Sequence, residues 1–367
     1  MNKNTTAVFA SYQARRTKNQ KAAFAQHVCS AASECGFTAN VETTKNNAKN
    51  IVVGDVKNAS VVYTAHYDTA SATFVPSFIF PKAPILTKLY QIAVALAMLI
   101  PSVIGYVLGA VLLPAVVTAV PKSIGALVGI ILAAAALVVA IRLVLCGKAC
   151  ENTANANTSG VAVLFEIMAK LPAEYRNKTA FVFFDAQENG CIGAADFAKK
   201  HKCIKKNKAL VLNFDCVGVG EHFVVATKKA DSFADALNAA FASKGNITAS
   251  VMKGGKRIPS DHNKFKCSAG VSSFNQKGNS LSLVINSNGA DTVYKEENIK
   301  FASDAGVMVA KYVLNPAAIS EKAEEESEAA PEAPAAEVEE VKATEEVVAA
   351  EADVSAEETA EETVAAE

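Results

Sequence analysis

Two long apolar runs constrain the fold of this chain more than any other feature. No charged residue occurs from Leu89 to Val120 or from Ser123 to Ile141, and Lys122 lies between the two runs. A helix of about 20 residues crosses the hydrocarbon core of a bilayer. The sequence therefore predicts a two-helix transmembrane hairpin. The alternative is a pair of buried core helices, but soluble helices rarely lack a polar face over such a length.

The charges around the hairpin predict its orientation. Lys82 and Lys88 precede it, Arg142 and Lys148 follow it, and only Lys122 lies at its tip. Because loops rich in Lys and Arg stay on the cytoplasmic side, both ends of the hairpin are expected there. We therefore expect a multi-pass protein of the cell membrane, with its soluble domain on the cytoplasmic side.

Charge is distributed unevenly along the chain. Glu321–Glu367 holds 18 acidic residues and two lysines, so the remainder carries 34 basic and 19 acidic residues. The acidic Ala/Glu-rich segment 319–367 has too little apolar surface to fold and is expected to be disordered. The basic remainder favours anionic membrane lipid as a partner. Its basic residues are scattered without an aromatic stacking platform, so no nucleic-acid partner is expected.

Outside the hairpin, strands and helices alternate. This alternation predicts an α/β fold, with a mixed, largely parallel sheet that has helices on both faces and is interrupted by the transmembrane hairpin. In this prediction, 1–82 and 148–318 form one domain and 83–147 is an insertion. The expected helices are 14–35, 159–170, 194–201, 231–242 and 297–314, and the expected strands are two within 50–66, then 180–185, 209–215, 222–227 and 280–285.

Polar residues follow several of the predicted strands. His66 and Asp68 end one strand, Gln187 and Glu188 follow another, and Asp215 ends a third. A lone acid at a strand end is more often a helix cap or a turn residue. The carboxyl ends of strands in an open α/β sheet, however, form the crevice where ligands bind. Several such ends together therefore predict a site.

Six motifs give these residues a family context. They are "TAHYDT", "NANTSGVAVLFEI", "FVFFDAQENGCIGAADFAKKH", "LNFDCVGVG", "SDHNKF" and "INSNGADTVYKEENI". In this order and with these spacings, the chain resembles the co-catalytic two-zinc aminopeptidases, metallopeptidase family 28, which includes bacterial leucyl aminopeptidase and glutamate carboxypeptidase. The resemblance covers residues 50–314 apart from the hairpin. It implies a zinc aminopeptidase-like fold and a site in which a carboxylate bridges two zinc ions.

Four site residues of that family are present here. By resemblance, His66 matches a zinc-binding histidine, and Asp68 matches the acid that orients it. Asp215 matches the other ligand of the same zinc, and Glu188 matches the acid ligand of the second zinc.

Three other positions depart from the family pattern. Ala156 stands where the bridging aspartate is expected, Gln187 where the general base is expected, and Asn286 where the second histidine is expected; a different gap puts Ser287 there. Without the bridging anion, two zinc cations would repel each other. A neutral amide cannot accept a proton from water, and Asn286 offers only a weak ligand.

We therefore expect a catalytically inactive aminopeptidase-like domain that acts as a binding or scaffold module, with a peptide or protein partner. At most one weakly bound zinc ion, or none, is expected at this centre. One alternative is an active zinc aminopeptidase that hydrolyses N-terminal peptide bonds with a reduced metal site, in which His262 is a candidate substitute ligand. The other is a purely structural membrane protein whose pocket binds nothing.

Overall fold

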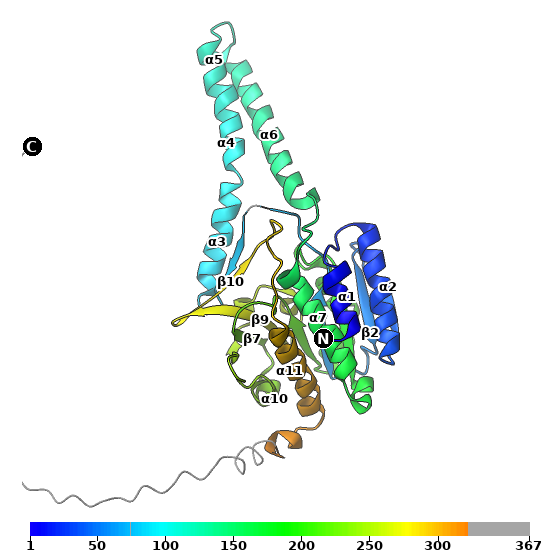
Figure 1. Ribbon diagram of the computed structural model, residues 1–367. Coiled ribbons are helices and arrows are strands. Elements are labelled where there is room, and N and C mark those ends of the chain that lie inside the picture. Colours follow the sequence, from blue (N-terminus) through cyan, green and yellow to red (C-terminus); the bar gives the residue numbers. More distant parts are fainter. Residues whose placement is uncertain (74, 322–367) are drawn as a thin grey trace, which may run out of the picture. The chain divides into compact units, whose positions relative to one another are not determined.

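The computed structural model describes residues 1–73 and 75–321 (Figure 1). Residues Met1–Glu324 form one compact unit. Residues 319–321 of the segment expected to be disordered are helical, and the rest of that segment lies outside the described residues.

A ten-stranded sheet forms the centre of the domain. Its main path runs β1-β2-β5-β3-β6-β9-β10-β4, and β7 pairs with β8 and β9. The four central strands β5, β3, β6 and β9 run parallel, and β7 and β8 also pair in parallel. The strands are β1 Ala39–Thr43, β2 Lys49–Gly54, β3 Val61–His66, β4 Ser77–Ile79, β5 Thr179–Phe184, β6 Leu210–Phe214, β7 His222–Lys228, β8 Thr248–Lys253, β9 Ser268–Lys277 and β10 Ser280–Ile285.

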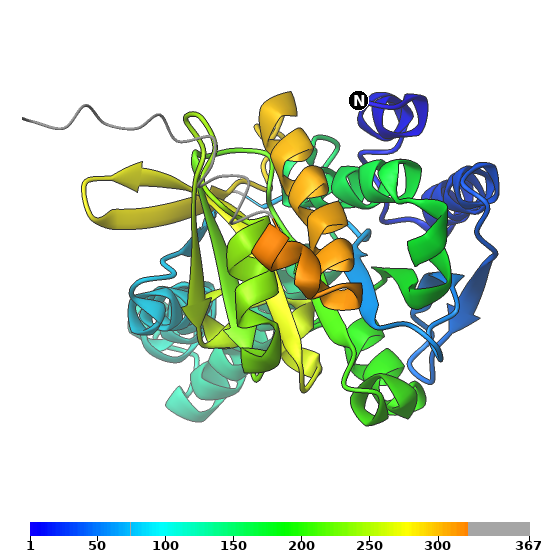
Figure 2. The same ribbon diagram turned by 90° about the horizontal axis from the view of Figure 1, so that it is seen from below.

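Helices cover both faces of this sheet, which confirms the predicted fold class. Tyr63 of β3 is buried on one face with Phe24 of α2 and Phe165 of α7. The neighbouring Val62 points to the other face and packs with Phe197 of α8. Figure 2 shows α7 and α11 on one side of the sheet and α8 and α9 on the other. The helices are α1 Lys3–Ser11, α2 Lys18–Glu34, α3 Pro84–Ala97, α4 Ile100–Val107, α5 Leu113–Val116, α6 Lys122–Cys146, α7 Ser159–Lys170, α8 Ile192–Lys200, α9 Lys202–Lys206, α10 Ala234–Ala240 and α11 Glu296–Leu314.

Some predicted boundaries shift and some elements were missed. The helix predicted from Ala14 begins at Lys18, because Thr17 and Gln20 form a capping box that fixes the start. Strands β1, β4, β8 and β9 and helices α1 and α9 were not predicted. Strand β9 contains several serines and a glycine, and its hydroxyls find partners only in the folded domain: Ser273 donates to the carbonyl of Val219 at 2.6 Å.

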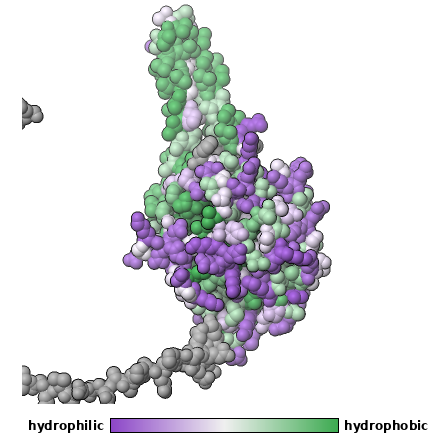
Figure 3. Space-filling view, in the orientation of Figure 1, coloured by the Kyte–Doolittle hydropathy of each residue, from purple (hydrophilic) through white to green (hydrophobic). Residues whose placement is uncertain are grey.

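The two apolar runs form a helical hairpin that extends away from the sheet (Figure 1). Pro84–Val116 and Lys122–Leu143 are long and apolar enough to cross a membrane, and only 11% of each apolar window is buried. They are therefore not core helices of this domain, so the core-helix alternative is wrong. The face of the hairpin seen in Figure 3 is mostly hydrophobic, whereas that of the sheet domain carries many hydrophilic residues.

Glycines let the hairpin helices pack backbone to backbone. Gly109, in the π-helical turn η1 (Leu108–Leu112), faces the backbone of Gly129 in α6. A Cβ atom on Gly129 would lie 2.7 Å from the carbonyl oxygen of Tyr106 and 2.8 Å from the amide nitrogen of Ala110. Such small-residue contacts are typical of helices that associate in lipid.

Candidate functional site

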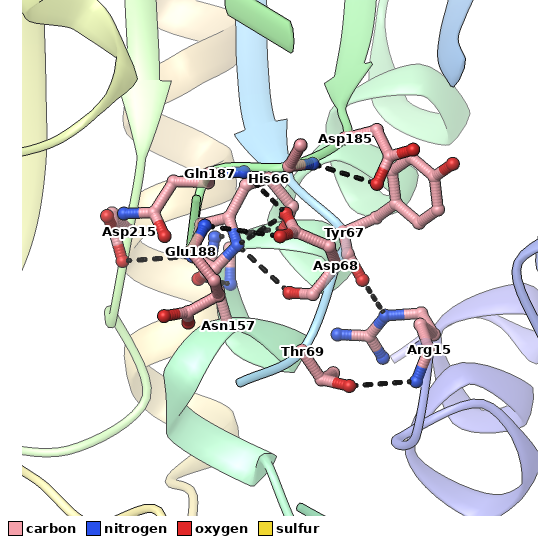
Figure 4. A network of polar contacts seen from close by, with 12 residues as sticks. Arg15, His66, Tyr67, Asp68, Thr69, Asn157, Asp185, Gln187, Glu188 and Asp215 are labelled. Carbon is pink, nitrogen blue, oxygen red and sulfur yellow. Dashed lines mark hydrogen bonds and ion pairs between the residues drawn. The ribbon is translucent and has the colours of Figure 1, made fainter. Parts of the chain in front are cut away.

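His66 lies between two carboxylates at the carboxyl end of β3. Its Nε2 is 3.7 Å from Oδ1 of Asp215, which follows β6. Its Nδ1 is 3.5 Å from Oδ1 of Asp68 and 3.1 Å from the backbone oxygen of the same residue. All three residues are buried. The parallel register of β3 with β5 and β6 brings these strand ends together (Figure 4).

The electrostatics of this group favour its charged form. Burial would lower the pKa of His66, but the nearby carboxylates of Asp215 and Asp68 raise it well above the ordinary value. Burial would likewise raise the pKa of Asp215, but His66 and the hydroxyl of Ser260 lower it to about 2. The Ser260 hydroxyl donates to Oδ2 of Asp215 at 2.5 Å. The proximity of His66 therefore lowers the pKa values of both carboxylates.

Asp68 also fixes the turn that carries Gln187 and Glu188. The backbone amide of Gln187 donates to Oδ1 of Asp68 at 3.0 Å, and that of Glu188 donates to Oδ2 at 3.2 Å. Both oxygens of Asp68 are thus engaged with the turn after β5 (Figure 4). Asp68 therefore joins two strand ends rather than offering a free carboxylate.

Two further carboxyl groups have raised pKa values. Glu188 is exposed at the edge of the site, where neighbouring protein atoms partly desolvate its carboxyl group. This desolvation, with the charges of Asp68 and Asp215, raises the pKa of Glu188 to about 7 against the attraction of His66. Burial, with the same two carboxylates, also raises the pKa of Asp261 to about 7. Sequence reasoning gave Asp261 no role, although it lies in the quoted motif "SDHNKF".

The three positions that depart from the family pattern carry no zinc-binding group. Ala156 packs against an apolar cluster that includes Cys216 and Ile258. Its backbone amide donates to the carboxylate of Asp291 at 2.8 Å. Gln187 is half-buried and held by its backbone, and Asn286 is half-buried just after β10.

The described residues assemble only part of the donor set of a two-zinc centre. No group of three or more His, Cys, Asp or Glu side chains that could hold a metal ion occurs within 1–73 and 75–321. His66 and Asp215 face each other but supply only two ligands, whereas protein zinc sites use three or four.

His262 is fixed away from any role as a substitute ligand. It is buried, its Nε2 lies 3.0 Å from the backbone oxygen of Gly255, and its ring packs against Gly270 of β9. Burial lowers the pKa of His262 to about 4. This histidine is therefore a neutral core residue that supports the sheet.

Arg15 is a support of the site that the sequence did not reveal. It is fully buried, and its Nε donates to the carbonyl of Tyr67 at 2.5 Å and its Nη1 to Thr158 Oγ1 at 3.1 Å. Its backbone amide donates to the hydroxyl of Thr69 (Figure 4). Burial lowers the pKa of Arg15 to about 9. Arg15 therefore braces the loop that follows His66.

Comparison with known proteins agrees with the motifs. Residues 144–311 match the model of Peptidase family M28, a little under half of the chain. The Legionella pneumophila LapA aminopeptidase is 13% identical, covering 84% of this chain and 70% of that chain, with a TM-score of 0.49. Porphyromonas gingivalis glutaminyl cyclase is 12% identical, covering 84% and 96%, with a TM-score of 0.48. A zinc aminopeptidase from Bacillus subtilis is 18% identical, covering 72% and 49%, with a TM-score of 0.41. No curated protein matches the chain.

The match over 144–311 confirms the resemblance to the M28 metallopeptidases. It includes Ala156, Gln187, Glu188, Asp215 and Asn286, whereas His66 and Asp68 lie before it.

Proposed function

We propose that this protein is a membrane-anchored, M28-like binding module without hydrolytic activity. The observation that carries this proposal is the pairing of His66 with Asp215 and Asp68. The His66 imidazole lies between these carboxylates, and its protonated form would balance their charge within the chain. The retained half of the centre is thus stable without a metal, and at most one zinc ion would bind weakly.

The replaced residues support the loss of hydrolysis. Peptide hydrolysis on two metals needs a bridging anion and a base that takes the proton from water. Gln187 cannot accept that proton, and loss of a general base alone typically lowers the rate by about 10²–10⁴-fold. The site would instead bind a peptide or protein ligand without cleaving it. An active aminopeptidase with a reduced metal site is the alternative outcome of the test below.

The hairpin supplies the membrane anchor in this proposal. Its two helices would span the cell membrane, with membrane lipid around them and the M28-like domain on the cytoplasmic side. The support is the length and apolarity of the two helices and the position of Lys82, Lys88, Arg142 and Lys148 at the domain end of the hairpin. Treating intact cells with protease tests the orientation. Removal of the C-terminal segment from outside would contradict it.

The catalytic part is tested on the full chain purified in detergent. Bound metal is measured by mass spectrometry of the elements, and turnover is measured on peptides with free amino termini. We expect neither stoichiometric zinc nor turnover. The matched variant restores the family residues at all three positions: Ala156→Asp, Gln187→Glu and Asn286→His. It should bind more zinc than the natural chain. Stoichiometric zinc together with turnover in the natural chain would refute the proposal.

A further inference from the structure

A cavity lies where the membrane hairpin meets the candidate site. Its volume is about 680 Å³, and its walls come from the first turns of α3 and from loops around Cys191 and Ser260. Volumes of this size are typical of sites for small organic ligands. Ser260 is also the residue whose hydroxyl donates to Asp215. The cavity therefore adjoins the polar centre described above.

The part of α3 that forms this wall extends past the end of α6. Gly109 lies against Gly129, and Gly125 lies against Pro114. The same antiparallel register places Arg142, near the end of the apolar span, level with about Leu96. Residues 84–91 therefore lie beyond α6. Lys88 is about 12 Å before Leu96 along the helix, so its side chain can reach the headgroup layer outside the hydrocarbon core.

An exposed apolar stripe on α3 connects the cavity with the membrane span. Ile85, Leu89, Ile92 and Leu96 are 75%, 57%, 47% and 60% exposed. Their spacing puts them on one helical face. Ile85 also lines the cavity. The stripe is thus a continuous apolar path from the bilayer to the cavity mouth.

The cavity itself is basic. Lys88, Lys256 and Lys264 line it, and no acidic residue does. These three lysines are exposed, and within the part of the chain that the structure describes their side chains form no hydrogen bond or ion pair. Their ammonium groups are therefore free to bind an anionic group.

We propose that this cavity binds an anionic phospholipid, with the headgroup phosphate on the lysines and an acyl chain along the apolar stripe of α3. The inference rests on the proposed insertion of the hairpin in the membrane. It adds a defined lipid site next to the polar centre. Ser260 belongs to both, because it lines the cavity and its hydroxyl donates to Asp215.

The test is a lipid titration of the full chain in detergent, followed by native mass spectrometry. Phosphatidylglycerol, phosphatidylcholine and glycerol 3-phosphate are compared. We expect the natural chain to bind phosphatidylglycerol more tightly than the other two. The double variant Lys88→Gln/Lys256→Gln should weaken phosphatidylglycerol binding roughly 30-fold, because each lysine near the headgroups contributes roughly fivefold.

The matched control removes two lysines from a second basic cavity. Lys205 and Lys229 line that cavity, which lies at the amino ends of β6 and β9. The variant Lys205→Gln/Lys229→Gln makes the same change in net charge and should bind phosphatidylglycerol like the natural chain. Circular dichroism of each variant checks that it folds.

Three results would overturn the lipid site. They are an equal loss of binding in both double variants, no preference for phosphatidylglycerol over phosphatidylcholine, and binding of glycerol 3-phosphate as tight as that of the lipid. Carbonate extraction of cell membranes separates this inference from the proposed function. A chain released by carbonate refutes membrane anchoring, whereas a chain that stays in the membrane but shows one of these three results refutes only the lipid site.

Discussion

Replacing Asp215 with asparagine tests whether the pairing with His66 stabilises the fold. Asn keeps the shape and can still accept from Ser260, but it removes the negative charge beside the imidazole. The pKa of Asp215 falls from 3.8 to about 2 in the folded chain. This shift corresponds to about 2 kcal/mol of stability at neutral pH. For a chain of this size, the melting temperature should fall by roughly 3 °C.

The pH dependence of this effect has a defined sign. Because the pKa of Asp215 is lowered on folding, its contribution is present above pH 3.8 and disappears as the pH falls toward 2. The pKa of His66 is raised on folding, so its contribution is present below 6.5 and disappears as the pH rises through the raised value. The difference between the natural chain and Asp215→Asn should therefore be largest between these limits, near pH 5, and should shrink near pH 2.5.

Melting of the full chain in detergent can be followed with a thiol-reactive dye, because Cys150 and Cys216 are buried free cysteines. Asp235→Asn is a matched control, since this exposed aspartate has no side-chain hydrogen bond or ion pair among the described residues. An Asp215→Asn variant that melts like the natural chain at pH 5 would refute the argument. A difference that grows below pH 3 would refute it too.

Three further predictions concern the metal, the hairpin and the core. Zinc should leave the melting temperature of the natural chain unchanged but raise that of the triple variant with the restored family residues, because zinc at 100 times its Kd adds about 2.7 kcal/mol to the free energy of unfolding. Gly129→Ala should loosen the hairpin, because the new methyl group would lie 2.7 Å from the Tyr106 carbonyl oxygen. Protease should then cleave the reconstituted variant faster than the natural chain. An unchanged cleavage rate would contradict this prediction. Gly270→Ala would overlap the His262 ring and should cost about 1–3 kcal/mol of stability in thermal melts, whereas an unchanged melting temperature would show that the ring can move.

The sequence predicted the elements that local patterns specify. The hairpin was recognisable because a long segment without charged residues can be identified in the sequence without knowledge of tertiary contacts. Helix 159–170 and strand 280–285 coincide with α7 and β10, because each carries a clear apolar pattern. The grouping of His66, Asp68 and Asp215 could also be predicted, because parallel strands place their carboxyl ends at one edge of the sheet.

The tertiary structure decided which partners these residues have. Asp68 accepts from backbone amides 119 and 120 positions away, and no local pattern reports such a contact. The burial of Arg15 and Asp261 depends on packing between distant segments, so the pKa of neither group could be inferred from the chain alone. The same holds for the cavity beside α3, whose lysines come from positions 88, 256 and 264. Hydropathy and spacing are local properties of a sequence, whereas charge pairing and cavity shape arise only when strands and loops far apart in the chain meet.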